Sequence, residues 1–248
     1  MNVHIKKFIE ENINLIEEDQ YEELYDKAGS FIDVHLLTET LLEAELDPLQ
    51  KLTYIPSNYL CETDIFSFSV PSHITEIKNG AFWQCENLNK VSLPEGLKKI
   101  GDSAFSECHN LWQVTLPSTL ESLQEDAFAE TNLQHLVIPD NIVTIPRHCF
   151  EECYQLKTLK LGKAVEILHD GCFGGCESLY YVQLNEGLKA IHRYVFKECK
   201  NLKEIYIPDS VIMISPTAFF KTDLKIICSK GSKAHEFAIT YDRPYELI

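Results

Sequence analysis

The middle of the sequence holds cysteines and histidines whose types and spacing could bind a metal ion or act on a substrate. These residues are Cys149, Cys153, Cys172, Cys176, His148 and His169. Thiolate and imidazole groups are the ligands that a tetrahedral Zn²⁺ takes. Such a site needs side chains that converge and a spacing such as Cys-x-x-Cys, which does not occur in this sequence. We therefore predict no metal and no cofactor.

Other catalytic motifs are also missing from the sequence, which contains no phosphate loop, dinucleotide fingerprint, nucleophile elbow or zinc-protease helix. Five cysteines stand three residues after a repeated phenylalanine: Cys85, Cys108, Cys153, Cys176 and Cys199. That regular placement is typical of cysteine used as a small buried hydrophobic residue. A thiol in apolar surroundings is a poor nucleophile, because burial disfavours the thiolate. We predict that the protein is not an enzyme.

The elements that position these cysteines are copies of one repeat, 22 or 23 residues long. Its phenylalanines are Phe82, Phe105, Phe128, Phe150, Phe173, Phe196 and Phe219. A leucine follows each of them five or six residues later and opens a run with apolar residues three and five places further on, as in Leu88, Val91 and Leu93. One copy is too short to enclose a core, so neighbouring copies must stack. The sequence predicts a solenoid.

The repeat resembles the leucine-rich repeat of the BspA-like family over roughly residues 55 to 240. The pattern that carries the resemblance is Leu-x-x-Val-x-Leu-Pro-x-x-Leu-x-x-Ile-Gly-x-x-Ala-Phe-x-x-Cys-x-x-Leu. The resemblance implies a parallel strand ladder and a binding role, and several known relatives are cell-surface adhesins. The expected fold is therefore an α+β solenoid of about seven repeats with a cap at each end.

The caps and the solenoid divide the chain into three expected parts. Residues 1–50 form an acidic helical cap, residues 51–228 the solenoid and residues 229–248 a short C-terminal cap. The first part carries thirteen acidic residues against three lysines. Its apolar residues, such as Ile5, Phe8 and Ile9, follow helical spacing. Covering the apolar edge of the first repeat is the simplest role for this segment.

The overall charge limits the kinds of partner. A formal net charge of −16 argues against binding nucleic acid directly or an anionic membrane, because either would be repelled. It favours a protein partner with a basic or mixed-charge surface. Nine cysteines placed by the repeat, together with an N-terminus that does not resemble a signal peptide, predict a reducing, cytoplasmic location. The oligomeric state stays open.

The outward positions of the predicted strands are the best candidates for a binding site, because packing does not constrain them. Large amphipathic and cationic side chains gather there: Trp112, Lys157, Lys160, Tyr180, Tyr181, Lys203 and Tyr206. Tyrosine and tryptophan are favoured at interface hot spots. They also simply suit strands, which is the competing explanation. We predict that the protein binds a protein partner through this face, which we expect to be concave.

Two alternatives remain. The acidic helices, with Glu17, Glu18, Glu22 and Glu23, could imitate the charge of a nucleic acid and occupy a basic cleft as an inhibitor. Alternatively, the protein could be a surface adhesin of the kind that the resemblance suggests.

Overall fold

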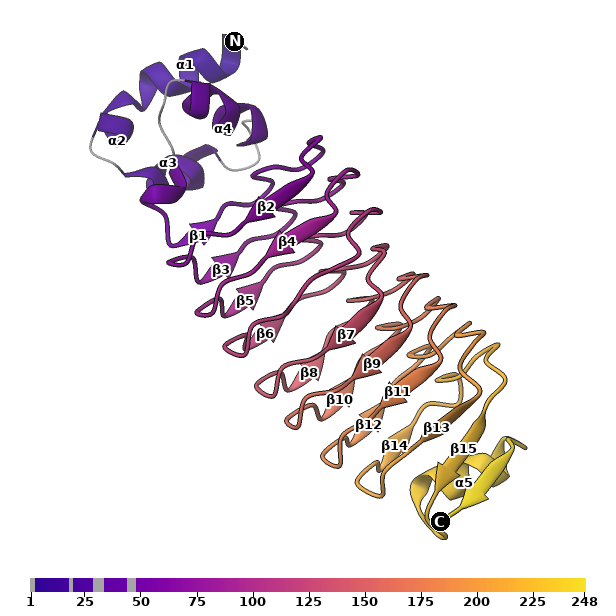
Figure 1. Ribbon diagram of the computed structural model, residues 1–248. Coiled ribbons are helices and arrows are strands. Elements are labelled where there is room, and N and C mark those ends of the chain that lie inside the picture. Colours follow the sequence, from indigo (N-terminus) through magenta and orange to yellow (C-terminus); the bar gives the residue numbers. More distant parts are fainter. Residues whose placement is uncertain (1–2, 18–19, 29–33, 44–47) are drawn as a thin grey trace.

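The chain forms an elongated solenoid with helices at its N-terminal end and one helix with a final strand at its C-terminal end (Figure 1). The computed structural model describes residues 3–17, 20–28, 34–43 and 48–248. Each of the seven rungs contains a short strand and a turn that carries the repeated phenylalanine, and all but the third also contain a longer strand. The expected repeat solenoid with a parallel strand ladder is confirmed.

One side of the solenoid is a ladder of longer strands, all of them paired in parallel. It consists of β2 (Ser67–Ser69), β4 (Lys90–Ser92), β7 (His135–Val137), β9 (Thr158–Lys160), β11 (Tyr181–Gln183), β13 (Glu204–Tyr206), β15 (Lys225–Cys228) and β16 (Tyr245–Leu247). In the third rung Gln113 replaces a strand and forms a single bridge with Lys90. In β4, β7, β9, β11 and β13 the middle residue, such as Leu159 or Val182, is buried, and its two neighbours point outward.

A second side is a ladder of two-residue strands, also parallel. It consists of β1 (Tyr54–Ile55), β3 (Glu76–Ile77), β5 (Lys99–Ile100), β6 (Ser122–Leu123), β8 (Thr144–Ile145), β10 (Ile167–Leu168), β12 (Ala190–Ile191) and β14 (Met213–Ile214). The second residue of each strand faces the core, which explains the recurrent apolar residue in the sequence.

The third side is a stack of turns that hold the phenylalanines. All seven rings are buried, and the centroids of successive rings lie 5.0 to 6.0 Å apart with interplanar angles of 3° to 11°. The turns also join to each other through the backbone, as in the bond from the Phe150 N–H to the Cys172 carbonyl, 3.0 Å long. Each rung therefore buries its apolar edge on the next one, as a repeat array requires.

The cysteine that stands three residues after five of the seven phenylalanines has a second use besides packing. Its thiol donates to the carbonyl of the phenylalanine one rung earlier, as in Cys108 Sγ to Phe82, 3.1 Å, and Cys176 Sγ to Phe150, 3.4 Å. Where the repeat has Thr222 instead, the hydroxyl donates to the same kind of carbonyl. The position therefore selects a small side chain with a hydrogen-bond donor.

The two ends of the array are closed by caps. The N-terminal cap contains α1 (Val3–Glu11), α2 (Ile13–Glu17), α3 (Tyr21–Ala28), α4 (Val34–Glu43) and the 3₁₀ helix η1 (Pro48–Gln50). Leu24 and Leu37 of this cap are fully buried and belong to the same continuous core as the first rungs. At the other end, α5 (Lys233–Thr240) begins after the N-cap residue Ser232. None of the described helices is long and apolar enough to cross a membrane.

In the described residues, both strand ladders are interrupted between the third and fourth rungs, and the ladder of longer strands is interrupted a second time, between β11 and β13. Within the described chain, Gln113 and β6 of the third rung form no strand pair with β7 and β8 of the fourth rung. The turn side remains joined across this junction, since the Phe128 N–H donates to the Cys149 carbonyl at 2.9 Å. The rings of Phe128 and Phe150 also stay stacked. The fourth rung is thus held to the third by its turn and its core.

Candidate protein-binding face

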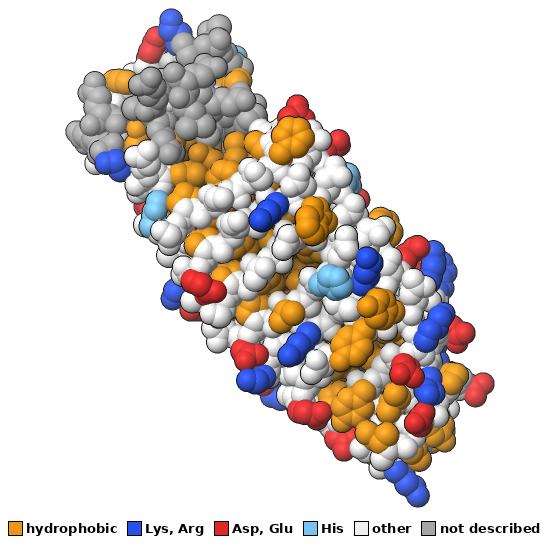
Figure 2. All heavy atoms as spheres, in the orientation of Figure 1, with side chains coloured by type: hydrophobic (Ala, Val, Ile, Leu, Met, Phe, Trp, Pro, Cys, Tyr) orange, Lys and Arg blue, Asp and Glu red, His pale blue; other side chains and the backbone are white. Residues whose placement is uncertain are grey.

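The outward side chains of the longer strands form one continuous surface, which we call the long-strand face. It comprises three columns of residues, one residue from each rung. They are residues 66, 89, 112, 134, 157, 180 and 203, then 67, 90, 113, 135, 158, 181 and 204, then 69, 92, 115, 137, 160, 183 and 206. Figure 2 shows this side, where hydrophobic and basic side chains are interspersed among polar ones.

Tyr180 and Tyr181 stand at the centre of the group that the sequence predicted. Their side chains are 57% and 52% exposed, although both residues follow the fully buried Leu179. Lys157 and Lys203 occupy the rungs on either side of Tyr180, and the Tyr180 N–H donates to the Lys157 carbonyl at 3.1 Å. The structure therefore brings the tyrosine pair together with two of the predicted lysines.

Tyr206 and Lys160 lie in the third column and are separated by Gln183. Tyr206 is half-buried. Burial, followed by the nearby carboxylates of Glu186 and Asp209, raises the pKa of the Tyr206 hydroxyl above its usual value. Its phenol is therefore neutral at physiological pH and can donate a hydrogen bond to a partner.

Trp112 is exposed but lies apart from this group. Its side chain is 48% exposed. It lies three rung spacings from Tyr180 in the same column. With rungs about 4.8 Å apart, that separation is about 14 Å. Two other exposed apolar residues of the face, Phe66 at 67% and Val137 at 61%, were absent from the predicted group. Both could have been found from the sequence, because each is an apolar residue at an outward position of a predicted strand.

The face is cationic within an acidic protein. Its three columns contain Lys90, Lys157, Lys160 and Lys203 but only one acidic residue, Glu204. Lys157 Nζ donates to Gln134 Oε1 at 3.1 Å, and Lys203 Nζ donates to the Lys200 carbonyl at 2.8 Å. Glu204 in turn lies 3.6 Å from Lys225 Nζ. Because the lysines of the columns are not paired with carboxylates in the described part of the chain, the face can attract acidic groups.

The acidic residues of the N-terminal cap are only partly described. Glu18 and the side chain of Glu17 lie outside the described residues. Glu22 and Glu23 are exposed on α3. Glu22 accepts a hydrogen bond from Thr53 Oγ1 at 3.3 Å, and Glu23 forms an ion pair with Lys27 at 2.9 Å. These two carboxylates thus have partners within the protein.

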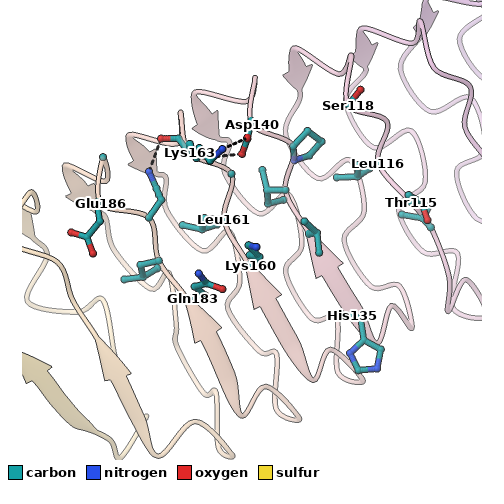
Figure 3. Close-up of a pocket in the computed structure, with 18 of the residues that line it drawn as sticks. Thr115, Leu116, Ser118, His135, Asp140, Lys160, Leu161, Lys163, Gln183 and Glu186 are labelled. Carbon is teal, nitrogen blue, oxygen red and sulfur yellow. Dashed lines mark hydrogen bonds and ion pairs between the residues drawn. The ribbon is translucent and has the colours of Figure 1, made fainter.

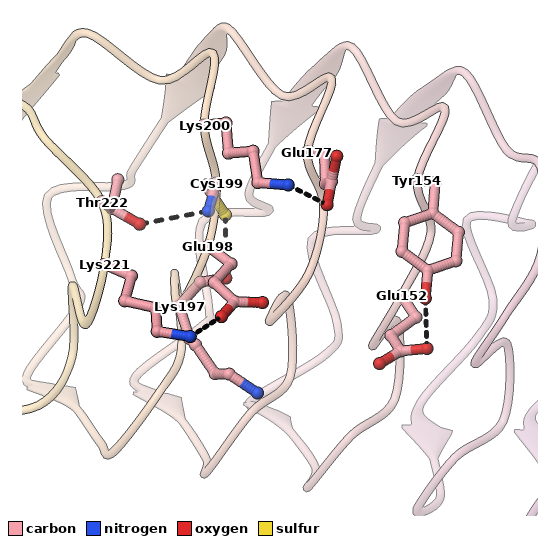
Figure 4. Close-up of polar contacts among 9 residues, drawn as sticks. All are labelled: Glu152, Tyr154, Glu177, Lys197, Glu198, Cys199, Lys200, Lys221 and Thr222. Carbon is pink, nitrogen blue, oxygen red and sulfur yellow. Dashed lines mark hydrogen bonds and ion pairs between the residues drawn. The ribbon is translucent and has the colours of Figure 1, made fainter.

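The turn side carries a stripe of acidic residues, which lysines of neighbouring rungs partly neutralise toward the C-terminus. Lys200 Nζ lies 2.5 Å from Glu177, and Lys221 Nζ lies 2.6 Å from Glu198 (Figure 4). The hydrogen bond from Lys221 lowers the pKa of the Glu198 carboxyl. Such exposed pairs contribute little stability, because solvent screens them.

The cysteines and histidines considered as metal ligands do not converge. All nine cysteines are free thiols, and Cys149, Cys153, Cys172 and Cys176 are completely buried. Burial raises the pKa of the Cys149, Cys172 and Cys176 thiols well above the usual value. His148 Nδ1 lies 2.7 Å from the carboxylate of Glu151, which is the partner of this ring nitrogen. In the described residues no group of three potential ligands could hold a metal ion.

A groove runs along the edge of the long-strand face, where the strands end and the chain turns (Figure 3). Its volume is about 920 Å³. Its floor is a column of buried apolar residues, Leu116, Ile138, Leu161 and Leu184. Val137, Lys160 and Gln183 border it on the side of the face, and the turns that follow the strands border it on the other side. The sequence analysis did not predict this groove.

A parallel solenoid whose rungs of 22 or 23 residues each bury a leucine and a phenylalanine is a leucine-rich repeat protein. The family model described as a BspA type leucine rich repeat region, in six copies, matches residues 53–180 and 122–235. The chain belongs to this family. Leucine-rich repeat proteins are generally non-enzymatic scaffolds that mediate protein interactions, and an adhesin-like role is also consistent with the family.

Two solved structures share the fold. A leucine-rich repeat protein from Bacteroides ovatus is 23% identical with a TM-score of 0.56, and the match covers 73% of this chain and 54% of that one. The T. pallidum leucine-rich repeat protein is 23% identical with a TM-score of 0.58, and the match covers 77% of this chain and 89% of that one. The chain thus spans about half the length of the B. ovatus protein. No curated protein matches the sequence.

Proposed function

We propose that the protein is a non-enzymatic binding module whose long-strand face takes up a protein partner. The observation that carries this proposal is the cluster of Tyr180, Tyr181 and Tyr206 with Lys157 and Lys203 on adjacent rungs. Tyrosine buries a large area at a small entropic cost, and lysine supplies a cation for acidic groups. The rungs beneath these residues are stacked, so the cluster needs little ordering when a partner binds.

The charge of the face supports a partner with a mixed-charge surface. Carboxylates of the partner would face the lysines of the long-strand columns, and basic residues would face the acidic remainder of the protein. Direct binding of nucleic acid is disfavoured by the net charge of −16. We also propose a reducing, cytoplasmic location, which is supported by the nine free thiols, eight of them buried.

The test is an affinity pull-down from lysate of the source cells with matched baits. One bait is wild type, one carries Tyr181→Ala with Tyr206→Ala, and one carries charge reversal of Glu17, Glu18, Glu22 and Glu23. The proposal predicts that the bait with Tyr181→Ala and Tyr206→Ala captures at least about tenfold less partner than the wild-type bait, as expected when a hot spot is removed. The helical reversal should weaken capture less and mainly at low salt.

The opposite result would contradict the proposal. If the tyrosine variant captures the partner as the wild type does while the helical reversal abolishes capture, the acidic cap is the binding domain and the solenoid is its support. Circular dichroism of each bait, compared with wild type, excludes misfolding as the reason for a loss.

A further inference from the structure

The groove beside the long-strand face coincides with the interruption of the strand ladders. Its lining includes Thr115 and Leu116 of the third rung and Val137 and Ile138 of the fourth. The strands of these two rungs form no pair with each other in the described chain. At this junction neither strand ladder joins the two rungs, whereas between β11 and β13 only the ladder of longer strands is broken.

The missing pairing leaves backbone groups available. At four other junctions the residue that follows the longer strand donates its N–H to a carbonyl of the next rung, at 2.9 to 3.0 Å. These bonds run from Val70 to Ser92, from Ile138 to Lys160, from Leu161 to Gln183 and from Ile207 to Ile227. The equivalent bond from the Leu116 N–H to the Val137 carbonyl is absent from the described hydrogen bonds, as are those from the Leu93 and Leu184 N–H groups. Among these three junctions, only the one at Leu116 also lacks a pair between the short strands. An extended peptide satisfies such groups, as it does when it adds to a sheet edge.

The dimensions of the groove also fit an extended segment. Its floor crosses four rungs, from Leu116 to Leu184. With a rung spacing of about 4.8 Å, this floor is about 14 Å long and matches about four extended residues. The apolar floor and the exposed Val137 side chain offer contact area to an apolar side chain of that segment.

Three carboxylates and two lysines line the groove: Glu95, Asp140, Glu186, Lys160 and Lys163. Glu186 lies near Tyr206, and the other four charges surround the middle of the groove. Asp140 is already paired with Lys163, whose Nζ lies 3.2 Å away and whose N–H donates to it at 2.9 Å. Glu95 accepts a hydrogen bond from the Ser118 hydroxyl at 2.9 Å. Lys160 is exposed and has no carboxylate within ion-pair distance among the residues that the structure describes. It is the cation of the groove that remains free for a ligand.

We infer that the groove binds an extended segment of about four residues from the partner, with a carboxylate side chain against Lys160 and an apolar side chain against Val137. This inference rests on the proposed protein-binding function and names the part of the partner that enters the groove. Main-chain hydrogen bonds to Leu116 and Val137 fix the direction of the segment, and Lys160 fixes its register.

The experiment uses the full chain and an array of terminally blocked synthetic peptides whose cores combine Glu, Leu, Lys and Ser. Peptides that place Glu beside Leu should bind best. Lys160→Glu should weaken binding of those peptides about tenfold and shift the preference toward Lys. Lys230→Glu is the matched control, because it makes the same charge change at an exposed lysine outside both the groove and the long-strand face, and it should leave the preference unchanged.

A second measurement reports the backbone directly. On addition of the best peptide, hydrogen exchange should slow in the segment that contains Leu116 and in the segment that contains Val137. If no peptide binds, if Lys160→Glu and Lys230→Glu act alike, or if exchange at Leu116 does not change, the inference is wrong.

These outcomes separate the groove from the proposed function. If the peptides fail while the variant with Tyr181→Ala and Tyr206→Ala still loses its partner from lysate, the groove is not the peptide site and the binding face stands. If the peptides bind in the groove while the tyrosine variant captures its partner fully, the groove stands and the tyrosine cluster is not the contact.

Discussion

Replacement of Phe150 by alanine tests the core of the array. The Phe150 side chain is completely buried, and its ring is stacked on Phe128 at 5.6 Å and on Phe173 at 5.5 Å. Loss of a buried phenylalanine costs about 3 to 5 kcal/mol through lost transfer free energy and the remaining cavity. Two stacked neighbours and turns that are hydrogen-bonded to both adjacent rungs hinder collapse of the cavity. We therefore expect a loss of about 4 to 5 kcal/mol in the free energy of unfolding.

The assay is urea-induced unfolding followed by circular dichroism, with Phe66→Ala as the control. The Phe66 side chain is 67% exposed, so its removal should change stability by no more than about 0.5 kcal/mol. Because each rung contacts only its neighbours, the Phe150 variant should also show a broader or divided transition. Equal stabilities of the two variants would refute the assigned repeat register and the stacked core.

Three further predictions concern the thiols and the turns. At pH 8 the native protein should show one thiol that reacts fast with a disulfide reagent, because Cys61 is the only cysteine that is not buried; fast reaction in Cys61→Ser would contradict this. Burial raises the pKa of thiols such as Cys149 and Cys172, so the neutral thiol is favoured in the folded state. Their contribution to stability is therefore complete below the unfolded pKa of about 8.5 and is lost as the pH rises beyond it. Urea titrations in reductant should show this decline between about pH 8.5 and 10, and a flat profile would refute it. Glu130 has a positive φ of 57°, and burial with neighbouring carboxylates raises the pKa of its side chain. Glycine adopts this φ without strain, whereas alanine does not, so Glu130→Gly should have a higher melting temperature than Glu130→Ala. A melting temperature of Glu130→Gly below that of Glu130→Ala would count against this explanation.

The fold could be predicted from the sequence because each rung repeats the same packing problem. A phenylalanine, a leucine and two apolar pairs recur in register, and every repeated phenylalanine is buried in the stack. The three outward columns followed from the alternation of a strand, so the adjacency of Lys157, Tyr180 and Lys203 could also be read from their spacing. The start of the terminal helix α5 can also be read from the sequence, because its N-cap, Ser232, is a residue type favoured at that position.

The groove could not be predicted in this way. It depends on backbone hydrogen bonds that are missing between the third and fourth rungs, and the apolar pattern is the same on both sides of that junction. The spacing from phenylalanine to leucine is five residues at this junction, from Phe128 to Leu133, instead of six. The same short spacing from Phe219 to Leu224 leaves β13 and β15 paired, so repeat length alone does not reveal an interruption. The sequence also could not show that Lys160 lacks an ion-pair partner among the described residues, because this depends on Asp140 forming its ion pair with Lys163.

The long-strand face is the central claim, and hydrogen exchange of the full chain with and without its captured partner tests it most directly. We predict slower exchange on binding in the segments that contain β11 and β13, where Tyr181 and Tyr206 lie, and unchanged exchange in α3. Protection confined to α3, with none in β11 and β13, would contradict the account.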